Sequence, residues 1–343
     1  MMSDINMRYI WVDWMKSILI ILMVLGHSGS LFTPYIYLFH IPAFFFVSGY
    51  LSNYSKPDQG SFSSSKYLIY AILIYNLFFI VLNGIKAYIE GIGLMHANGG
   101  TDFYELVIRP VLGITWCYYK GSPIPNPLCG QFWFVWVLLI MKYLYRIIAY
   151  RPLSFKLVIC FLCILYSSTI YHFEVSTFFY IDRFVMAFPF FIVGNLFRNI
   201  KFLPCKWGGV KLEGYKNVLF SIALMLLCIF IYYAFNNEMP DIFHFRFGKS
   251  VILYYLVAFI GIYSLMFFCR ILPKYNIVKT ISIGTFLILA LHLIILSYLN
   301  FSIIEIDKTR ILALTIVLLI CVPCISVVNR RWPILLGKKM KNK

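Results

Sequence analysis

The chain has 343 residues, of which 62% are hydrophobic and only 13% are charged. A soluble domain is about half apolar and about a quarter charged, whereas apolar runs of about 18 residues recur along this whole chain. A net charge of +17 would suggest nucleic-acid binding in a soluble protein. Here the basic residues are spread over short segments between apolar runs, so they are better explained as topology signals. We therefore expect a membrane protein that has no nucleic-acid partner.

The apolar runs predict an all-α bundle of about ten transmembrane helices, which together form one integral-membrane domain over residues 1–343. In chain order the expected spans are 12–29, 36–52, 67–89, 131–149, 154–171, 178–197, 217–235, 249–271, 277–299 and 309–328. Most lysines and arginines fall on the side of the N-terminus, which predicts that both termini are cytoplasmic. A long outer loop then covers about 90–130, and a basic cytoplasmic tail covers about 329–343.

The cysteines and the standard motifs give little chemistry. Cys160/Cys163 and Cys321/Cys324 have CxxC spacing, but each pair lies in an apolar run without histidine or acidic neighbours, so we expect no metal site. Cys117 and Cys129 could form a disulfide if their loop is extracytoplasmic. The chain has no Walker loop, dinucleotide fingerprint or GxSxG elbow, which argues against ATP-driven transport and a soluble-type hydrolase.

Three histidines fall inside predicted spans. His27 is near the outer end of the first span and His40 near the outer end of the second, and a short connection should bring the two imidazoles together. His292 is expected about 10 Å below the outer end of the ninth span. Ionisable residues within membranes are costly and tend to be functional, and imidazole suits acid–base chemistry near neutral pH. Alternatively, these histidines bridge helices as polar contacts.

Lys16 and Asp13 are three residues apart, so they share a face of the first helix near its inner end. Eleven residues separate Lys16 from His27, which is about 16 Å of helix and roughly half of the hydrocarbon thickness. The pair is either part of a site or an orientation anchor with a local ion pair.

Three further candidates lie toward the outer side. Arg183 follows Asp182 at the start of the sixth span, where the two either bind a charged or hydroxylated ligand or pair with each other and snorkel outward. Arg109 lies in the long outer loop. Trp133, within "GQFWF" at 130–134, could stack on a sugar ring or belong to an interfacial aromatic belt.

The N-terminal stretches "RYIWVDWMKSILIILMVLGHSG" and "IYLFHIPAFFFVSGYL" resemble the opening of the acyltransferase-3 family. These are polytopic bacterial membrane proteins that O-acylate surface glycans, and the fucose 4-O-acetylase-like branch is the most similar. The matching elements are Asp13, the spacing from Lys16 to His27, and the FH-P-FF-SGY block at 39–50. "QFWFVWVLLIMKYL", "IDRFVMAFPFFIVGNLF" and "ISIGTFLILALHLIIL" resemble later segments of the family.

This resemblance implies a multi-pass enzyme of the bacterial inner membrane, an O-acetyltransferase that uses cytoplasmic acetyl-CoA. The acceptor would be a hydroxyl of a lipid-linked or polymeric glycan such as O-antigen, capsule or exopolysaccharide. His27 would be the catalytic base or a transient acyl carrier, with Lys16 and Asp13 on the donor side or supporting the helix. Where some relatives carry an arginine-rich donor motif, this sequence offers only Lys66.

We expect the substrates to be bound by His40, Arg183, His292, Arg109 and Trp133, with membrane lipid around the bundle. The sequence does not indicate an oligomeric state. The main alternative is an exporter or flippase of a polysaccharide or lipid-linked glycan. A further alternative is a small-molecule transporter with histidine proton relays.

Overall fold

The computed structural model describes residues 10–54, 61–89, 132–173, 180–199, 214–235, 238–299 and 310–339. These ranges are helical and contain no β-strand, only an isolated bridge between Asp241 and Arg246. The helices are α1 (Ile10–His27), α2 (Thr33–Tyr37), α3 (His40–Leu51), α4 (Ser61–Ile89), α7 (Trp133–Ile148), α8 (Leu153–His172), α9 (Ile181–Asn199), α10 (Gly214–Phe235), α11 (Val251–Ile271), α12 (Asn276–Ile283), α13 (Thr285–Tyr298), α15 (Ile311–Arg331) and the short 3-10 helix η3 (Pro333–Leu336). The all-α prediction is confirmed, and every expected span coincides with a helix or a broken helix.

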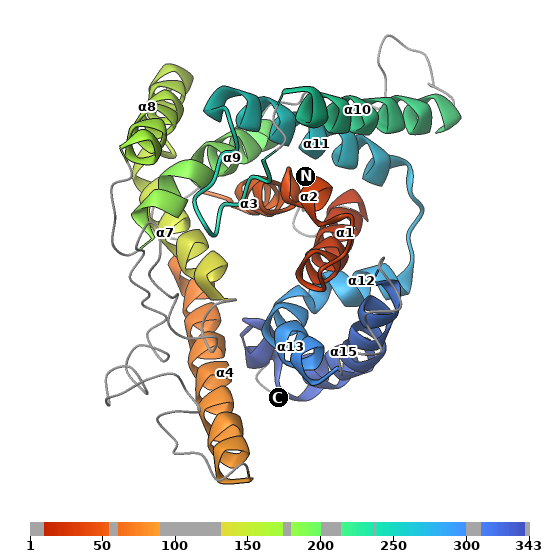
Figure 1. The fold of residues 1–343 in the computed structure, drawn as a ribbon. Helices are drawn as coiled ribbons and strands as arrows, with labels where there is room; N and C mark the ends of the chain where they lie inside the picture. The colour runs from red at the N-terminus through yellow and green to blue at the C-terminus, as the bar shows by residue number, and fades with distance from the viewer. Residues whose placement is uncertain are drawn as a thin grey trace, which may run out of the picture.

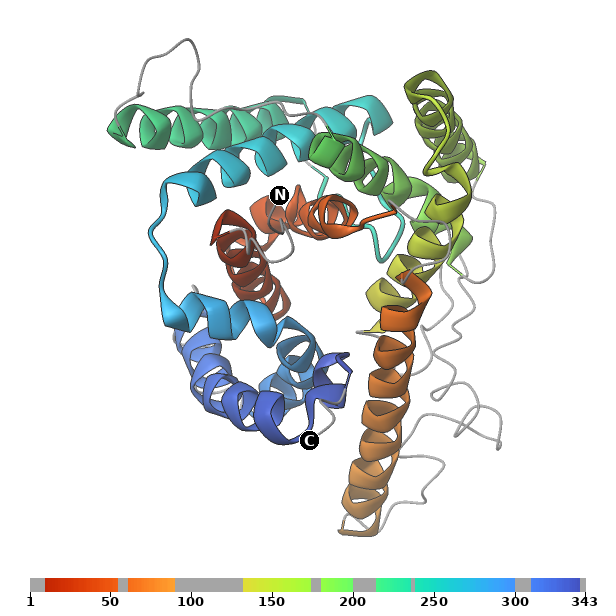
Figure 2. The ribbon, with the colours of Figure 1, turned by 180° about the vertical axis from the view of Figure 1, so that it is seen from behind.

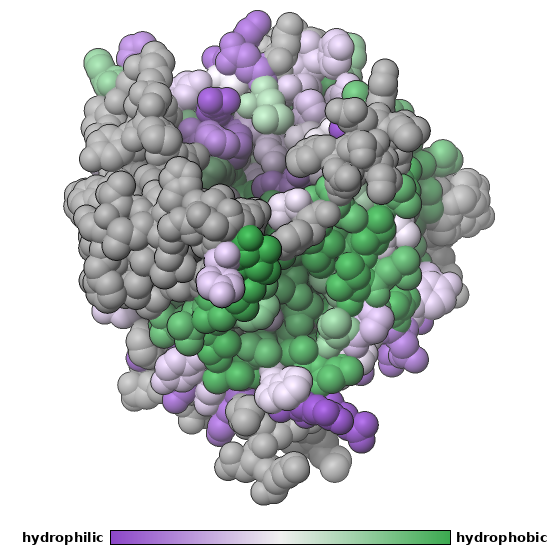
Figure 3. Space-filling model, turned by 60° about the horizontal axis from the view of Figure 1, so that its bottom comes forward, coloured by the Kyte–Doolittle hydropathy of each residue, from purple (hydrophilic) through white to green (hydrophobic). Residues whose placement is uncertain are grey.

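Several of these helices are suited to cross a membrane. Within the described residues, five segments are long and apolar enough, namely α1, α2 with α3, α8, α11 and α15, and the bent pair α12–α13 makes a sixth. Large apolar side chains point outward on α8 and α15, where lipid would solvate them. Figure 3 shows a broad hydrophobic surface with hydrophilic residues above and below it. The chain is therefore a multi-pass membrane protein, while ten spans and cytoplasmic termini stay predictions.

The N-terminal helices occupy the middle of the structure. Figures 1 and 2 show α1 and α3 surrounded by the other helices, with α10 and α11 on one side and α12, α13 and α15 on the other. Helix α1 contacts α3, α11, α12, α13 and α15. Because protein surrounds α1, its polar side chains meet other helices rather than lipid.

Helices α3 and α9 cross at two glycines. A Cβ atom on Gly49 would lie 2.0 Å from the carbonyl oxygen of Phe191, and one on Gly194 would lie 2.0 Å from that of Phe46. Small residues allow this close backbone approach between membrane helices. Next to the crossing, the buried Asn195 amide donates to the carbonyls of Gly49 (3.0 Å) and Ser52 (2.8 Å), so the end of α3 is tied to α9.

Helices α10 and α11 are joined by a pair of serines. Ser221 Oγ donates to the backbone carbonyl of Ser264 at 2.8 Å, and Ser264 Oγ donates to that of Ser221 at 2.7 Å. Reciprocal hydroxyl–carbonyl bonds of this kind replace the hydrophobic effect, which cannot hold helices together in lipid. They fix the two helices that flank the loop 238–250.

Two of the expected spans are broken within the membrane region. The second span is interrupted at Leu38 and Phe39, between α2 and α3. The ninth bends by 75° between α12 and α13, around Gly284. A side chain at Gly284 would meet Ile325 of α15, whose Cδ1 lies 2.2 Å from the position of the absent Cβ. Both breaks lie beside the cavity described next.

Candidate functional site

A cavity of about 1170 Å³ lies beside α1 and is also lined by α3, α7, α13 and the loop 238–250. Its lining includes the predicted site residues Asp13, Lys16, His27, His40, Trp133 and His292. Arg183 is not part of the lining. Arg109, Cys117 and Cys129, together with most of the predicted outer loop, lie outside the described residues.

The cavity has two chemically different ends, which α1 defines. The Lys16 end contains Asp13, Lys16, Lys142, Arg198, Ser282 and Lys338, and the His27 end contains His27, Tyr37, His40, Trp133, Asp241, His244 and His292. Lys16 and His27 are eleven residues apart on α1, or about 16 Å. The C-terminal end of α3 lies at the Lys16 end of the cavity, as the edge contact between the rings of Trp11 and Tyr50 shows (centroids 4.8 Å apart).

At the Lys16 end, α1 is attached to the break between α12 and α13. The Lys16 ammonium donates to the backbone carbonyl of Ser282 at 2.7 Å. The Ser282 hydroxyl donates to the Asp13 carboxylate at 2.7 Å, and Ser17 Oγ donates to the carbonyl of Val278 at 2.8 Å. The shared face predicted for Asp13 and Lys16 therefore meets the last turn of α12, where backbone carbonyls lack helical partners.

At the His27 end, aromatic rings from α1, α2, α3 and α13 adjoin one another. The centroids of His27 and His292 are 5.2 Å apart. Those of His27 and Tyr37 are 6.3 Å apart, and those of Tyr37 and His40 are 5.0 Å apart. The predicted proximity of His27 and His40 is thus mediated by Tyr37, while His292 is a direct neighbour of His27.

Hydrogen bonds fix the orientation of two of these imidazoles. His40 Nδ1 bonds the carbonyl of Ile36 at 2.8 Å, and His292 Nδ1 bonds those of Ile288 (3.1 Å) and Leu289 (2.9 Å). A carbonyl only accepts, so Nδ1 carries the proton and Nε2 of the neutral ring is left as an acceptor. Both side chains are buried, and His292 Nε2 has no partner among the described residues.

His27 differs from these two histidines. Its side chain is exposed to the cavity, and within the described part of the chain no hydrogen bond engages its ring. A ring without a fixed backbone partner can exchange a proton with a ligand at either nitrogen. His27 is therefore the imidazole of this end that is best placed for acid–base or nucleophilic chemistry.

The loop 238–250 brings an acidic residue to the histidines. Asp241 accepts hydrogen bonds from the backbone N–H of Phe243 (2.8 Å) and from His244 Nδ1 (2.6 Å). Its carboxylate also lies within electrostatic range of His27, Tyr37 and His40. Asp241 is largely buried and lines the cavity, so it is the acidic group of the His27 end.

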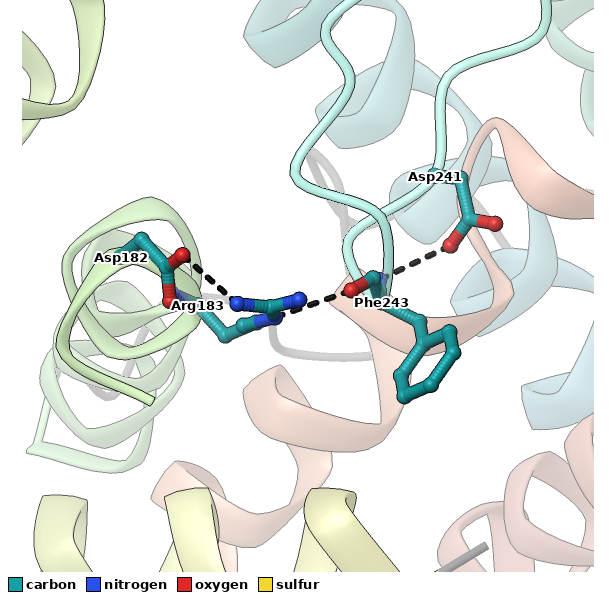
Figure 4. A network of polar contacts seen from close by, with 4 residues as sticks. All are labelled: Asp182, Arg183, Asp241 and Phe243. Carbon is teal, nitrogen blue, oxygen red and sulfur yellow. Dashed lines mark hydrogen bonds and ion pairs between the residues drawn. The ribbon is translucent and has the colours of Figure 1, made fainter. Parts of the chain in front are cut away.

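Arg183 lies behind this loop and holds it in place. As Figure 4 shows, its guanidinium donates to the carbonyl of Phe243 at 2.9 Å and forms an ion pair with Asp182 at 2.6 Å. The Asp182 and Arg183 side chains are only 1% and 9% exposed. The two residues thus pair with each other, as one of the two sequence interpretations expected, but the expected outward snorkelling is wrong, because both side chains are buried among helices. Arg183 positions Phe243 and does not line the cavity.

Trp133 and Phe243 form an aromatic wall at the His27 end, with ring centroids 5.6 Å apart. Both line the cavity. Aromatic walls with a few convergent polar groups are typical of binding sites for small ligands. That Trp133 stacks on a sugar ring therefore stays a prediction, and Phe243 is a second aromatic residue that could contact the same ligand.

Sequence reasoning missed Asp241, Tyr37 and the cations Lys142 and Arg198. The signal for Asp241 was its position three residues before His244 in a short polar segment between two apolar runs. The two cations looked like topology signals, because a lysine or arginine at the inner end of a span is expected in any membrane protein. Their convergence on one cavity depends on how α7 and α9 pack.

Comparison with known proteins gives one match. A family model described as an acyltransferase domain, that of acyltransferase-3, matches residues 9–330. No curated protein and no solved structure matches the chain.

Proposed function

Because the chain belongs to the acyltransferase-3 family, we propose that it is a membrane O-acetyltransferase that moves an acyl group from cytoplasmic acyl-CoA to a bacterial surface glycan. The observation that carries this proposal is the cavity that joins the Lys16 end to the His27 end. Acyl-CoA is made in the cytoplasm, whereas surface glycans mature outside. A transferase that takes its donor from the cytoplasm and acylates a glycan outside needs a passage across about half of the membrane.

The charges of the cavity agree with this direction. Among the residues that the structure describes, the Lys16 end carries Lys16, Lys142, Arg198 and Lys338 against one acid, Asp13, and it faces the cytoplasm in the predicted topology. An anionic thioester donor would be attracted to that end. The His27 end is less basic and is lined by hydroxyl, imidazole and carboxylate groups, which suits a polyhydroxylated acceptor.

The proposed reaction centres on His27. Its imidazole takes the proton of the acceptor hydroxyl while that oxygen attacks the thioester carbonyl. The ester C–O bond forms, the C–S bond breaks, and the CoA thiolate leaves and receives the proton from the imidazolium. Asp241 would stabilise the imidazolium electrostatically, as carboxylates beside catalytic histidines do. The acceptor sugar would lie against Trp133 and Phe243.

A comparison of surface glycans tests the proposal. We expect a His27→Ala strain to export glycan that lacks the ester-linked acyl group, measured by NMR or mass spectrometry of the purified polymer, with the variant protein present in the membrane. If the chain were an exporter or flippase, the same variant would retain acylated glycan inside the cell and none would reach the surface. Unchanged acylation of exported glycan would refute the proposal.

A further inference from the structure

The Lys16 end of the cavity contains a lysine, Lys142, for which the described residues provide no counter-ion. Lys142 lies in the second half of α7, is partly buried and lines the cavity. Within the described residues, no carboxylate, carbonyl or hydroxyl pairs with its ammonium group, and its backbone carbonyl is the acceptor of the Tyr54 hydroxyl at 3.2 Å. An unpaired cation in a membrane protein is costly and calls for an anion.

A second cation approaches the same place from another helix. Arg198, in the last turn of α9, donates to the backbone carbonyl of Leu51 at 3.3 Å. Both residues are thus attached near the end of α3, Lys142 through its backbone carbonyl to the Tyr54 hydroxyl just after the helix, and Arg198 through its guanidinium to Leu51, the last residue of α3. Both line the cavity, and α7 contacts α9 directly.

A third cation reaches the cavity from the segment after α15. The ammonium group of Lys338 donates to Asn329 Oδ1 at 3.0 Å, next to a turn at Gly337 that has a positive φ of 66°. A Cβ atom on Gly337 would lie 2.4 Å from Leu68 Cδ2, so the turn packs closely on α4. This packing holds Lys338 at the cavity.

The acidic side chains of this end do not balance these charges. Asp13 is the only carboxylate that lines the Lys16 end within the described ranges, and it accepts a hydrogen bond from Ser282. Cations from three segments that are far apart in sequence thus line one cavity, in which the described residues supply one carboxylate at the Lys16 end. Lysine and arginine are the side chains that bind phosphate, as a point charge and as a bidentate donor respectively.

We propose that Lys142, Arg198 and Lys338 form a phosphate-binding subsite at the Lys16 end of the cavity. The inference deepens the proposed function, since the phosphates of an acyl-CoA donor are the natural occupants there. The same chemistry would also hold the phosphate of an anionic lipid.

Binding to the purified full-length protein in nanodiscs tests the subsite. Isothermal titration calorimetry with CoA and with dephospho-CoA compares the wild type with K142M, R198Q and K338M. We expect K142M to weaken CoA binding by about tenfold or more, the loss typical of one charge-assisted hydrogen bond. The conservative variant K142R should restore most of the affinity. Because methionine keeps an unbranched apolar chain but lacks the charge, a loss in K142M with recovery in K142R assigns the effect to the positive charge.

Lys156 provides a matched control. It is also a lysine on a membrane helix, α8, but its ammonium group donates to the carbonyl of Ala149 at 2.6 Å and it does not line the cavity. K156M should bind CoA like the wild type. Dephospho-CoA lacks only the 3′-phosphate of CoA. The variant that has lost the side chain that binds this phosphate should therefore bind CoA and dephospho-CoA with equal affinity.

Native mass spectrometry of protein from nanodiscs with and without phosphatidylglycerol separates the two phosphate sources. One outcome is that the wild type binds phosphatidylglycerol but no CoA, and that K142M no longer binds the lipid. The subsite then stands with a lipid as its ligand, and the acyl-CoA proposal fails. Equal binding of both CoA and phosphatidylglycerol by the wild type, K142M, R198Q and K338M would overturn the subsite. That result would leave the His27 chemistry untouched, because glycan acylation tests it separately.

Discussion

The ammonium group of Lys16 donates a 2.7 Å hydrogen bond to the backbone carbonyl of Ser282, at the point where α12 ends. The break between α12 and α13 leaves carbonyl groups without helical N–H partners, and a cation at the C-terminus of a helix also interacts favourably with its dipole. Lys16 is therefore attached to the structure that closes the Lys16 end of the cavity, in addition to lining it.

We expect Lys16→Met to lower the thermal stability of the purified protein. The change removes a hydrogen bond from a charged donor, which is worth about 1.5–3 kcal/mol, and leaves the Ser282 carbonyl unsatisfied. Thermal unfolding in detergent measures the effect. Lys66→Met on the exposed surface of α4 is the control, and equal melting temperatures of the two variants would contradict this role of Lys16.

The crossing of α3 and α9 should tolerate no side chain at Gly194. A methyl group there would overlap the backbone carbonyl of Phe46, which cannot move as a flexible side chain could. Overpacking of this kind costs about 1–3 kcal/mol or more, so Gly194→Ala should reduce both the yield and the melting temperature. Cys324→Ala, an exposed change on α15, should have neither effect. A Gly194→Ala variant with normal stability would show that the helices cross less closely.

The buried pair of Asp182 and Arg183 offers a coupling experiment. Arg183→Met removes the guanidinium that pairs with the buried Asp182 carboxylate, a change that costs about 3–5 kcal/mol in buried pairs. The double variant Asp182→Leu/Arg183→Met should recover part of the lost stability, because it removes both charges. It should still lose transfer activity, since the carbonyl of Phe243 is no longer held. Additive losses of stability in the double variant would rule out the coupling.

Asp241→Asn tests the carboxylate beside the histidines. The amide retains an oxygen for the backbone N–H of Phe243 but removes the negative charge near His27. Because this change leaves the imidazole itself in place, we expect the rate of acyl transfer to fall by about 10–100-fold, at or below the lower end of the roughly 100–10,000-fold that acid–base catalysis contributes. The KM for the acyl donor should not change, since the donor phosphates would bind at the other end. Glu238→Gln, an exposed change in the same loop, is the control. An unchanged rate in Asp241→Asn would remove Asp241 from the mechanism.

Much of the fold follows from local sequence signals. The apolar runs predicted the positions of the long helices, because in a bilayer the backbone must satisfy its own hydrogen bonds and an apolar run therefore becomes a helix. They did not predict η3, which lies in the segment expected to be a basic tail. The breaks at Leu38–Phe39 and Gly284 were not predictable in this way. At the bend, Gly284 packs against Ile325, which is 41 residues later in the chain and contributes nothing to a local pattern.

The part of the site that lies on one helix was predictable from the sequence, and the part that depends on tertiary packing was not. Lys16 and His27 lie on one helix, so their separation could be calculated from the sequence. The direct neighbour of His27 is His292, which arrives from α13 through tertiary packing, and Asp241 arrives through a loop that folds back over the cavity. Arg183 could not be separated from the cavity residues by its sequence position, since its role depends on the carbonyl of Phe243.

The requirement for His27 tests the central claim most directly. Membranes of the producing strain carry the acceptor, so acetyl-CoA labelled in the acetyl group is supplied to membranes that contain the wild type, His27→Gln or His172→Gln. His172 is an exposed histidine at the end of α8 that does not line the cavity. We expect His27→Gln to reduce labelled ester in the glycan by at least about 100-fold, with His172→Gln close to the wild type. Equal labelling by His27→Gln and the wild type would contradict the account.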